Sequence, residues 1–128
     1  MATIGDVMSK NLLTVEEEAT LVQTAAAMNA RQVGAVLVVR GGRLRGILTE
    51  RDILRAAATG ELAGNVGAWM TPHPETVEAD ESAQHAGVIM IHGGFRHLPV
   101  LDGDEPIGIV SIRDLMRVVL EDVSPRGV

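Results

Sequence analysis

The chain contains one ten-residue pattern twice, and this duplication constrains its fold more than any other feature. The pattern reads GILTERDILR over residues 46–55 and GIVSIRDLMR over residues 108–117. The two copies lie 62 positions apart, and the same offset relates Met8 to Met70 without a gap. A fixed period of this size indicates one structural unit that is used twice. The sequence therefore predicts a duplicated domain.

Each unit is predicted to fold in the order β-α-β-β-α. In each copy of the pattern an apolar stretch, typical of a strand, runs into a helix, with a hydroxyl at the junction and a carboxylate three residues later. Thr20 and Ser82 are predicted helix N-caps, and Gly41-Gly42 is predicted to close a hairpin. The elements expected in the first unit are a helical lead-in at 4–8, an extended piece at 12–15, a helix at 20–32, strands at 35–39 and 44–48, and a helix at 50–59 with Ile53, Leu54 and Ala57 facing inward. Those expected in the second are an extended piece at 76–77, a helix at 82–91, strands at 97–101 and 106–111, and a helix at 112–122, before a frayed tail at 124–128.

The predicted fold class is α/β in the α+β sense, with two repeats that share a core. The first repeat is expected at residues 4–60, a linker at 61–67 and the second repeat at 68–122. Neither repeat could bury the face of its sheet alone, so the two are expected to pack together. The whole chain of 128 residues then makes one module.

Composition excludes several classes of function. Lys and Arg total 11 against 17 Asp and Glu, and the resulting net charge of −6 disfavours binding to nucleic acid or to an anionic membrane. No apolar run approaches the roughly 20 residues of a membrane span. Trp69 and Phe95 are the only aromatic residues, so there is no platform on which bases could stack. The absence of cysteine and of a signal-peptide pattern favours a cytoplasmic location.

The paired units resemble the cystathionine-β-synthase (CBS) domain, two of which in tandem form a Bateman module. The resemblance rests on the pattern of a glycine, two apolar residues, Ser or Thr, two further residues and Asp, which closes both units. Met8 and Met70 ahead of the first strands support it, as does the stretch RHLPVLD at residues 96–102, which is similar to the family's basic-basic-Leu-Pro-Val strand. The resemblance covers about residues 4–121. It implies two repeats related by a pseudo-twofold axis.

The resemblance also implies a non-catalytic regulatory module in signal transduction, with adenosine-containing ligands bound in two clefts between the repeats. In the family the Asp of the pattern holds the ribose diol and its Ser or Thr meets phosphate. The adenine lies against the segment that opens the other repeat. An adenine nucleotide would be a regulatory ligand, and no cofactor is required. Carried over to this sequence, the sites are Asp52, Thr49 and Ile47 with Pro74 and Glu75, and Asp114, Ser111 and Ile109 with Leu12 and Leu13.

The chemistry of the pattern supports such a site, but a second interpretation is open. A carboxylate offers two acceptor oxygens to the two donors of a cis-diol, and a helix N-terminus offers free N–H groups to a phosphate. However, Ser or Thr followed three residues later by Asp at a helix start is also nearly a capping box. The two interpretations overlap, because a site without ligand can cap its own helix.

Basic residues near the pattern have two interpretations as well. Arg96 and His97 open a strand of the second repeat, whereas the first repeat has Gly34-Ala35 at these positions. The basic pair is either a phosphate contact on one side of the module or a solvated strand end. Arg51 and Arg113 either reach phosphate or form ion pairs on the helix surface.

Metal and catalytic sites are not predicted. His73, His85, His92 and His97 lack the spacing of metal ligands, and no cysteine accompanies them. No pair of nucleophile and base stands out. The leading hypothesis is therefore a non-catalytic module that senses AMP, ADP, ATP, S-adenosylmethionine or a dinucleotide and acts on an effector protein in trans. A homodimer is expected, because the helices at 20–32, 82–91 and 112–122 offer more apolar faces than one small sheet can cover, and the resemblance implies the same. The alternative is a CBS protein with a structural or interaction role and no ligand.

Overall fold

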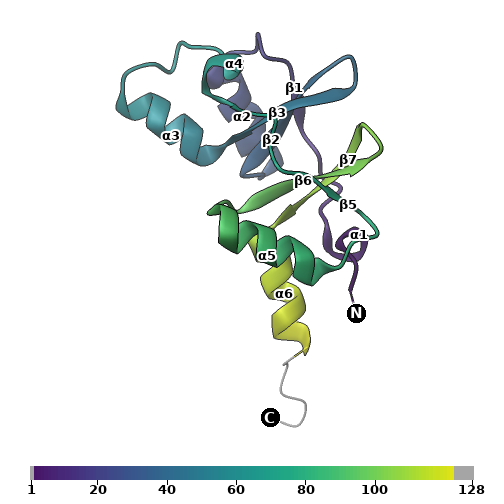
Figure 1. Cartoon of the computed structure of the whole chain (residues 1–128). Helices are drawn as coiled ribbons and strands as arrows, with labels where there is room; N and C mark the ends of the chain where they lie inside the picture. The colour runs from purple at the N-terminus through teal and green to yellow at the C-terminus, as the bar shows by residue number, and fades with distance from the viewer. Residues whose placement is uncertain (1, 123–128) are drawn as a thin grey trace. The chain divides into compact units, whose positions relative to one another are not determined.

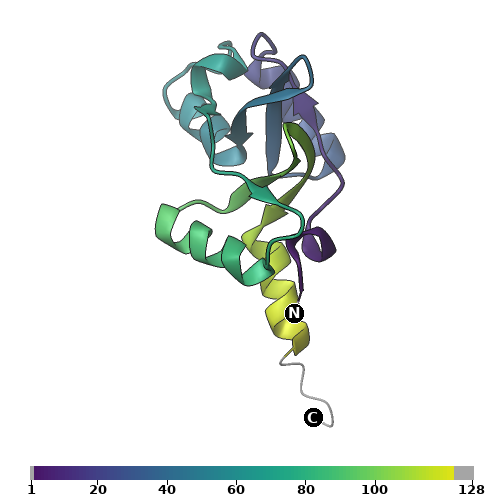
Figure 2. The same ribbon diagram turned by 45° about the vertical axis from the view of Figure 1, so that its right-hand side comes forward.

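Residues 2–122 are described by the computed structural model of the chain, and they form two compact units (Figures 1 and 2). The first-repeat unit comprises Asn11–Pro74 and Gly103–Pro106. The second-repeat unit comprises residues 2–10, 75–102 and 107–122. The start of the chain thus belongs to the same unit as the second repeat.

The predicted order of elements is confirmed in both repeats. Thr20 caps the first long helix by accepting a hydrogen bond from the Gln23 N–H, and Ser82 caps its counterpart by accepting from the His85 N–H. The first repeat contains α1 (Ile4–Val7), β1 (Thr14–Val15), α2 (Leu21–Arg31), β2 (Ala35–Arg40), β3 (Arg43–Thr49) and α3 (Glu50–Ala58). The second contains α4 (Val66–Trp69), β4 (Thr71–Pro72), β5 (Val77–Glu78), α5 (Ala83–Gly93), β6 (His97–Asp102), β7 (Glu105–Ser111) and α6 (Ile112–Asp122).

Each unit has one sheet. The first-repeat sheet has the order β1-β2-β3-β4, in which β1 is parallel to β2 while β3 is antiparallel to both of its neighbours. The second-repeat sheet has the order β5-β6-β7, and β5 is parallel to β6. Gly41 and Gly42 join β2 to β3 with φ of 58° and 77°, the left-handed conformation that a tight hairpin turn needs at both positions. The predicted hairpin is therefore confirmed.

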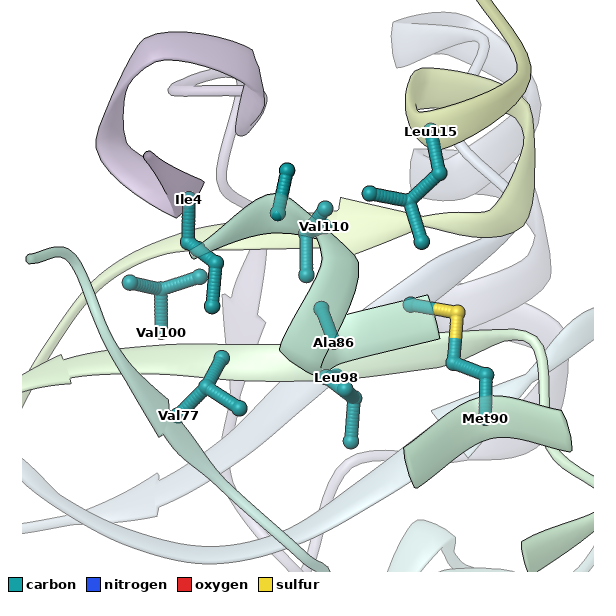
Figure 3. Packing of buried hydrophobic residues seen from close by; sticks show 9 residues of the cluster. Ile4, Val77, Ala86, Met90, Leu98, Val100, Val110 and Leu115 are labelled. Carbon is teal, nitrogen blue, oxygen red and sulfur yellow. The ribbon is translucent and has the colours of Figure 1, made fainter. Parts of the chain in front are cut away.

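The two cores are built from corresponding positions. Figure 3 shows the second-repeat core, in which Ile4 of α1 and Leu115 of α6 lie over the strands with Met90 of α5. Met28 and Val66 take the places of Met90 and Ile4 in the first-repeat core. The second-repeat core comprises Ile4, Val77, Ala83, Ala86, Met90, Leu98, Val100, Val110 and Leu115, and the first comprises Leu21, Met28, Val36, Val38, Leu48, Ala56 and Val66.

The short leading helices are held in the same way in both units. In the second-repeat unit the Gly5 N–H of α1 donates to the Ala79 carbonyl at 2.8 Å, and in the first-repeat unit the Gly67 N–H of α4 donates to the Glu17 carbonyl at 2.9 Å. A Cβ at Gly5 would lie 3.2 Å from the Ala79 carbonyl oxygen, so the close approach favours glycine. The leading helix of each repeat is consequently part of the other repeat's unit, which explains the membership of the two units.

The glycine that opens each copy of the ten-residue pattern is required by a crossing segment. A Cβ at Gly46 would lie 2.6 Å from the Met70 sulfur and 2.8 Å from the Thr71 carbonyl oxygen. At Gly108 it would lie 2.6 Å from the Met8 sulfur. In each copy the glycine is therefore needed because the methionine of the crossing segment fills the space that a Cβ would take.

Three details differ from the prediction or lie outside it. Leu54 and Ala57 do not face inward: Leu54 is 68% exposed, because α3 turns the face that contains Asp52 and Ala56 toward the unit. Helix α4 begins at Val66, inside the stretch expected to be a linker. The predicted tail at 124–128 lies outside the described residues. No helix within residues 2–122 has the length and apolar character needed to cross a membrane.

Candidate functional site

The first copy of the pattern joins β3 to α3 with the carboxylate of Asp52 turned back to the junction. Asp52 Oδ2 accepts hydrogen bonds from the Thr49 backbone N–H at 2.9 Å and from the Thr49 hydroxyl at 3.1 Å. Asp52 Oδ1 lies 3.4 Å from a guanidinium nitrogen of Arg55, one turn further along α3. Asp52 is buried, with 7% of its surface exposed, so these partners compensate for the lost hydration of a charge.

The second copy repeats the same geometry between β7 and α6. Asp114 Oδ2 accepts from the Ser111 N–H at 2.8 Å and from the Ser111 hydroxyl at 3.0 Å. The Ser111 oxygen also accepts from the Asp114 N–H at 3.1 Å, which completes a capping box. Capping is thus an observed role of the pattern. It does not exclude a ligand, because rotation of the Ser111 hydroxyl would free that hydroxyl and one acceptor site on Asp114 Oδ2.

The two carboxylates differ in how firmly their second oxygen is held. Arg55 has a hydrogen bond to Asp52 and also lies over the Trp69 ring, 6.0 Å from its centroid. The corresponding Arg117 lies 3.8 Å from Asp114 Oδ1, outside hydrogen-bond range. Position 7, which corresponds to Trp69, is a valine. The arginine that binds Asp52 is therefore also held by an aromatic ring, whereas the arginine near Asp114 has a valine in the place of that ring.

The residues just before the central strands β2 and β6 lie beside the N-terminal ends of helices α3 and α6. The Glu50 N–H donates to the Gly34 carbonyl at 2.9 Å, and the Ile112 N–H donates to the Arg96 carbonyl at 2.9 Å. The predicted phosphate-contacting residue Arg96 is therefore next to Ser111, with its side chain exposed, and His97 is half-buried at the first position of β6. Neither Arg51 nor Arg113 forms an ion pair with another residue of the described range 2–122, so the surface ion pairs considered for them are not found there.

The remaining predicted contacts lie on or near the strands of the pattern. Ile47 and Ile109 are buried, two residues before the hydroxyls. The backbone of Ser9 exchanges hydrogen bonds with Ile109, at 2.8 and 3.1 Å, and β4 pairs Thr71 with Ile47. Leu12 and Leu13 follow Ser9 in the chain, and Pro74 and Glu75 follow Thr71.

The expected grouping of these segments with the carboxylates stays a prediction. Leu12, Leu13 and Pro74 belong to the first-repeat unit with Asp52, whereas Glu75 belongs to the second-repeat unit with Asp114. Two contacts near the site were missed by sequence reasoning. The spacing of three residues from Asp52 could have indicated Arg55, but no sequence signal brings Trp69 to it, because that contact depends on the docking of α4.

Residues 2–122 contain no group of three or more His, Asp or Glu side chains that could hold a metal ion. All their buried side-chain nitrogen and oxygen atoms have hydrogen-bond partners. What the two pattern sites can offer chemically is therefore a carboxylate, a hydroxyl and the N-terminal end of a helix.

Two curated relatives share most of their length with this chain. An uncharacterized 17.7 kDa protein of Acidianus ambivalens is 35% identical over 124 residues, which is 94% of this chain and 76% of that protein. The CBS domain-containing protein YhcV of Bacillus subtilis is 33% identical over 117 residues, covering 90% of this chain and 84% of its own.

Solved structures of CBS proteins match the fold. A protein with CBS domains from Burkholderia ambifaria MC40-6 has a TM-score of 0.87 at 32% identity, with 94% of this chain and 96% of that one covered. CBSX2 in complex with AMP has a TM-score of 0.83 at 25% identity, covering 94% and 98%. The CBS domain pair of protein MJ0100, in complex with 5′-methylthioadenosine and S-adenosyl-L-methionine, has a TM-score of 0.87 at 25% identity, covering 92% and 99%.

The family model of the CBS domain matches the sequence twice, at residues 4–59 and 64–121. These two matches take in most of the chain, and they coincide with the two β-α-β-β-α repeats of the structure. The chain therefore belongs to the CBS domain family and carries two CBS domains in tandem, the arrangement of a Bateman module.

Proposed function

We propose that this protein is a regulatory module that binds adenosine-containing ligands, one through Thr49 and Asp52 and one through Ser111 and Asp114. The observation that carries the proposal is the duplicated placement of a hydroxyl and a largely buried carboxylate at a helix start. Further support comes from CBSX2 and MJ0100, which are related in fold and were solved with AMP, 5′-methylthioadenosine and S-adenosyl-L-methionine.

Counting acceptors shows how a ribose diol would fit. An ionised carboxylate has about four acceptor sites. Thr49 takes two on Oδ2 of Asp52, and Arg55 takes one on Oδ1. Counted over residues 2–122, one site on Oδ1 is open, and rotation of the Thr49 hydroxyl frees a second. In this proposal the rotated hydroxyl turns to the 5′ group of the ligand, so the diol and the 5′ group engage the pattern together.

The adenine is proposed to lie against the segment that opens the other repeat. Ser9 is hydrogen-bonded to Ile109 only two residues before Ser111, and the chain then continues into Leu12 and Leu13. Correspondingly, Thr71 pairs with Ile47 before the chain continues into Pro74 and Glu75. The proposal groups Asp114 with Leu12-Leu13 and Asp52 with Pro74-Glu75, as the family resemblance implies.

We further propose that the module is a cytoplasmic homodimer that regulates an effector protein in trans, without catalytic activity of its own. Helices α5 and α6 pack on each other (Figure 1). Both leave large apolar side chains exposed to solvent. Ile91 is 75% exposed. A second copy is the commonest cover for such a face. The exposed side chains are Val88 and Ile91 on α5, and Met116, Val119 and Leu120 on α6.

Light scattering at micromolar concentration tests the dimer and should return about twice the chain mass of 13.6 kDa. Ile91→Glu should shift the mass toward the monomer, because it places a charge in the apolar face. Val22→Glu on α2 is the matched control on a helix that lacks such a cluster. A single-chain mass at every concentration would contradict the dimer.

The ligand site is tested with Asp52→Ala, Asp114→Ala and a 2′,3′-dideoxy analogue of adenosine. Each substitution removes charge-assisted hydrogen bonds at one site, which should cost about 2–4 kcal/mol, or roughly 30- to 1000-fold in affinity. The dideoxy analogue should show the same loss with the unaltered chain. If both variants titrate as the unaltered chain does, the pattern only caps its helices, and an interaction protein without ligand becomes the better interpretation.

A further inference from the structure

The residue after the hydroxyl differs in charge between the two copies of the pattern. In the first copy it is Glu50, and in the second it is Ile112. Glu50 is exposed and has no ion pair or side-chain hydrogen bond with any other residue in the range 2–122. Its carboxylate lies against Gly34, since a Cβ at Gly34 would be 3.4 Å from Glu50 Cδ and Oε1. Within residues 2–122 the Glu50 carboxylate therefore lies at the N-terminal end of α3 without a direct partner.

The N-terminal end of α6 carries basic residues and no acidic residue at the corresponding positions. Arg96 stands where the first copy has Gly34, and Ile112 stands where it has Glu50. Arg96 and Arg113 have no acidic partner among the described residues, so their two positive charges are available to a ligand at the N-terminal end of α6. In the first copy the charge of Arg51 is offset by Glu50. The same backbone geometry thus carries one acidic and one basic residue at the start of α3 and two basic residues at the start of α6.

We propose that Glu50 makes the first site select adenosine derivatives whose 5′ group is neutral or cationic, such as a thioether or a sulfonium, and reject 5′-phosphates. The inference rests on the proposed function, because it names the ligand class of the site formed by Thr49 and Asp52. Phosphorylated ligands are left to the site of Ser111 and Asp114.

The physical reason is that both the ligand phosphate and Glu50 compete for the same end of the helix. A helix N-terminus attracts a phosphate through its free N–H groups and its partial positive charge. Glu50 is the first residue of α3, so its negative charge belongs to the first turn, where the helix end favours an anion. A phosphate placed beside the Thr49 hydroxyl would be repelled by the carboxylate of the next residue, whereas a sulfonium would be attracted.

Both chemical classes of ligand occur in proteins of this fold. MJ0100 was solved with a thioether and a sulfonium derivative of adenosine, and CBSX2 with a phosphate derivative. The adenosine part is common to the three ligands, so the discrimination has to come from groups near the 5′ position. At the position after the hydroxyl, the charge of Glu50 distinguishes the first site from the second, which has Ile112 there.

Calorimetry on the full chain can isolate the first site if Asp114→Asn is present in every sample. Glu50→Gln removes the charge and keeps the size of the side chain. Glu61→Gln is the matched control, because it makes the same charge change in the same unit just beyond the other end of α3. The probes are adenosine, AMP and S-adenosylmethionine, each at low and at high salt.

Glu50→Gln should raise the affinity for AMP about 5- to 50-fold, leave adenosine nearly unchanged and weaken S-adenosylmethionine. The gain for AMP should shrink at high salt, because salt screens exposed charges. Glu61→Gln should alter none of the three. If Glu50→Gln changed the affinities for AMP and adenosine equally, the proposed selection by charge would be wrong, but the proposed adenosine site would stand. If the unaltered chain binds none of the probes, the proposed function fails and the inference falls with it.

Discussion

The two CBS domains of this chain share a backbone scheme and differ in what surrounds their key carboxylates. Asp52 and Asp114 accept the same pair of hydrogen bonds, with distances that agree within 0.1 Å between the copies. Around the first lie Arg55, supported by Trp69, and Glu50, which has no ion pair within residues 2–122. Around the second lie Arg96 and Arg113. The comparison teaches that the duplicated backbone defines where a ligand could bind, whereas single side-chain replacements decide which ligand each copy would accept.

The contact between the pattern glycine and the crossing methionine should be the largest shared determinant of stability. Gly46→Ala forces a Cβ against the Met70 sulfur and the Thr71 carbonyl oxygen, and the backbone atom cannot rotate away. Such overpacking should lower the free energy of unfolding by about 1–3 kcal/mol. Gly108→Ala should have a similar cost, because Met8 and Ser9 surround it in the same way. Urea denaturation measures both.

Gly87→Ala is the control for these substitutions. Gly87 lies in α5, and a Cβ there would be at an ordinary contact distance of 3.7 Å from Leu115. Replacing glycine by alanine inside a helix should therefore stabilise the protein by about 0.5–1 kcal/mol. A neutral effect of Gly46→Ala beside this gain would show that the crossing segment adapts and that the glycine is not required.

The arginines one turn after each carboxylate should differ in their effect on ribose binding. Arg55→Ala should weaken adenosine at the first site by roughly 2- to 5-fold, as expected for an exposed ion pair. Arg117→Ala should have a smaller effect at the second site, since Arg117 makes no hydrogen bond to Asp114. The effect of Arg55→Ala should vanish for 2′,3′-dideoxyadenosine, because the arginine acts through Asp52.

The single tryptophan gives this comparison an optical readout. Trp69 emission should change when Arg55 is replaced, whereas the Arg117 variant should leave it unaltered, because only Arg55 lies over the ring. A loss of affinity that is the same for adenosine and its dideoxy analogue would mean that Arg55 supports the fold rather than the carboxylate.

The smallest expected difference is between the stabilities of the short helices α1 and α4 at acidic pH. The Thr3 backbone N–H, together with its hydroxyl, holds the pKa of Asp6 below its usual value of 3.8. Because the pKa is lowered in the folded state, the stabilisation is present above about pH 4 and is lost as the pH falls through the lowered pKa. Helix α4 has Ala68 at the corresponding position and lacks this cap. Amide exchange in α1 should therefore accelerate in acid more than in α4, and Asp6→Asn should remove the difference.

Most of the fold could be predicted because it follows from local patterns that occur twice. The caps Thr20 and Ser82 and the turn at Gly41-Gly42 are determined by neighbouring residues, and the structure confirms them. Helix α4 was missed although the offset from α1 indicated it, since its glycine-rich surroundings resemble a linker. Leu54 was placed inward because helical periodicity alone does not identify which apolar face meets the sheet.

The candidate site was predictable only in its sequence-local part. The hydroxyl and the carboxylate are three residues apart, and this spacing at a helix start brings Thr49 to Asp52. The approach of Trp69 to Arg55, and of Glu50 to Gly34, depends on how α4 and β2 pack against α3. Contacts of this kind join residues far apart in the chain, and single residue types in a sequence do not indicate them.

The central claim, that the chain has two adenosine sites of unequal charge, is tested most directly by calorimetry with adenosine and AMP on the unaltered chain and on Arg96→Ala. Adenosine should show two binding events per chain of similar affinity. AMP should show one event that is tighter than adenosine and one that is weaker, and Arg96→Ala should reduce the tighter one by roughly 3- to 30-fold. Equal affinities for AMP and adenosine at both sites, or no binding of either, would contradict the account.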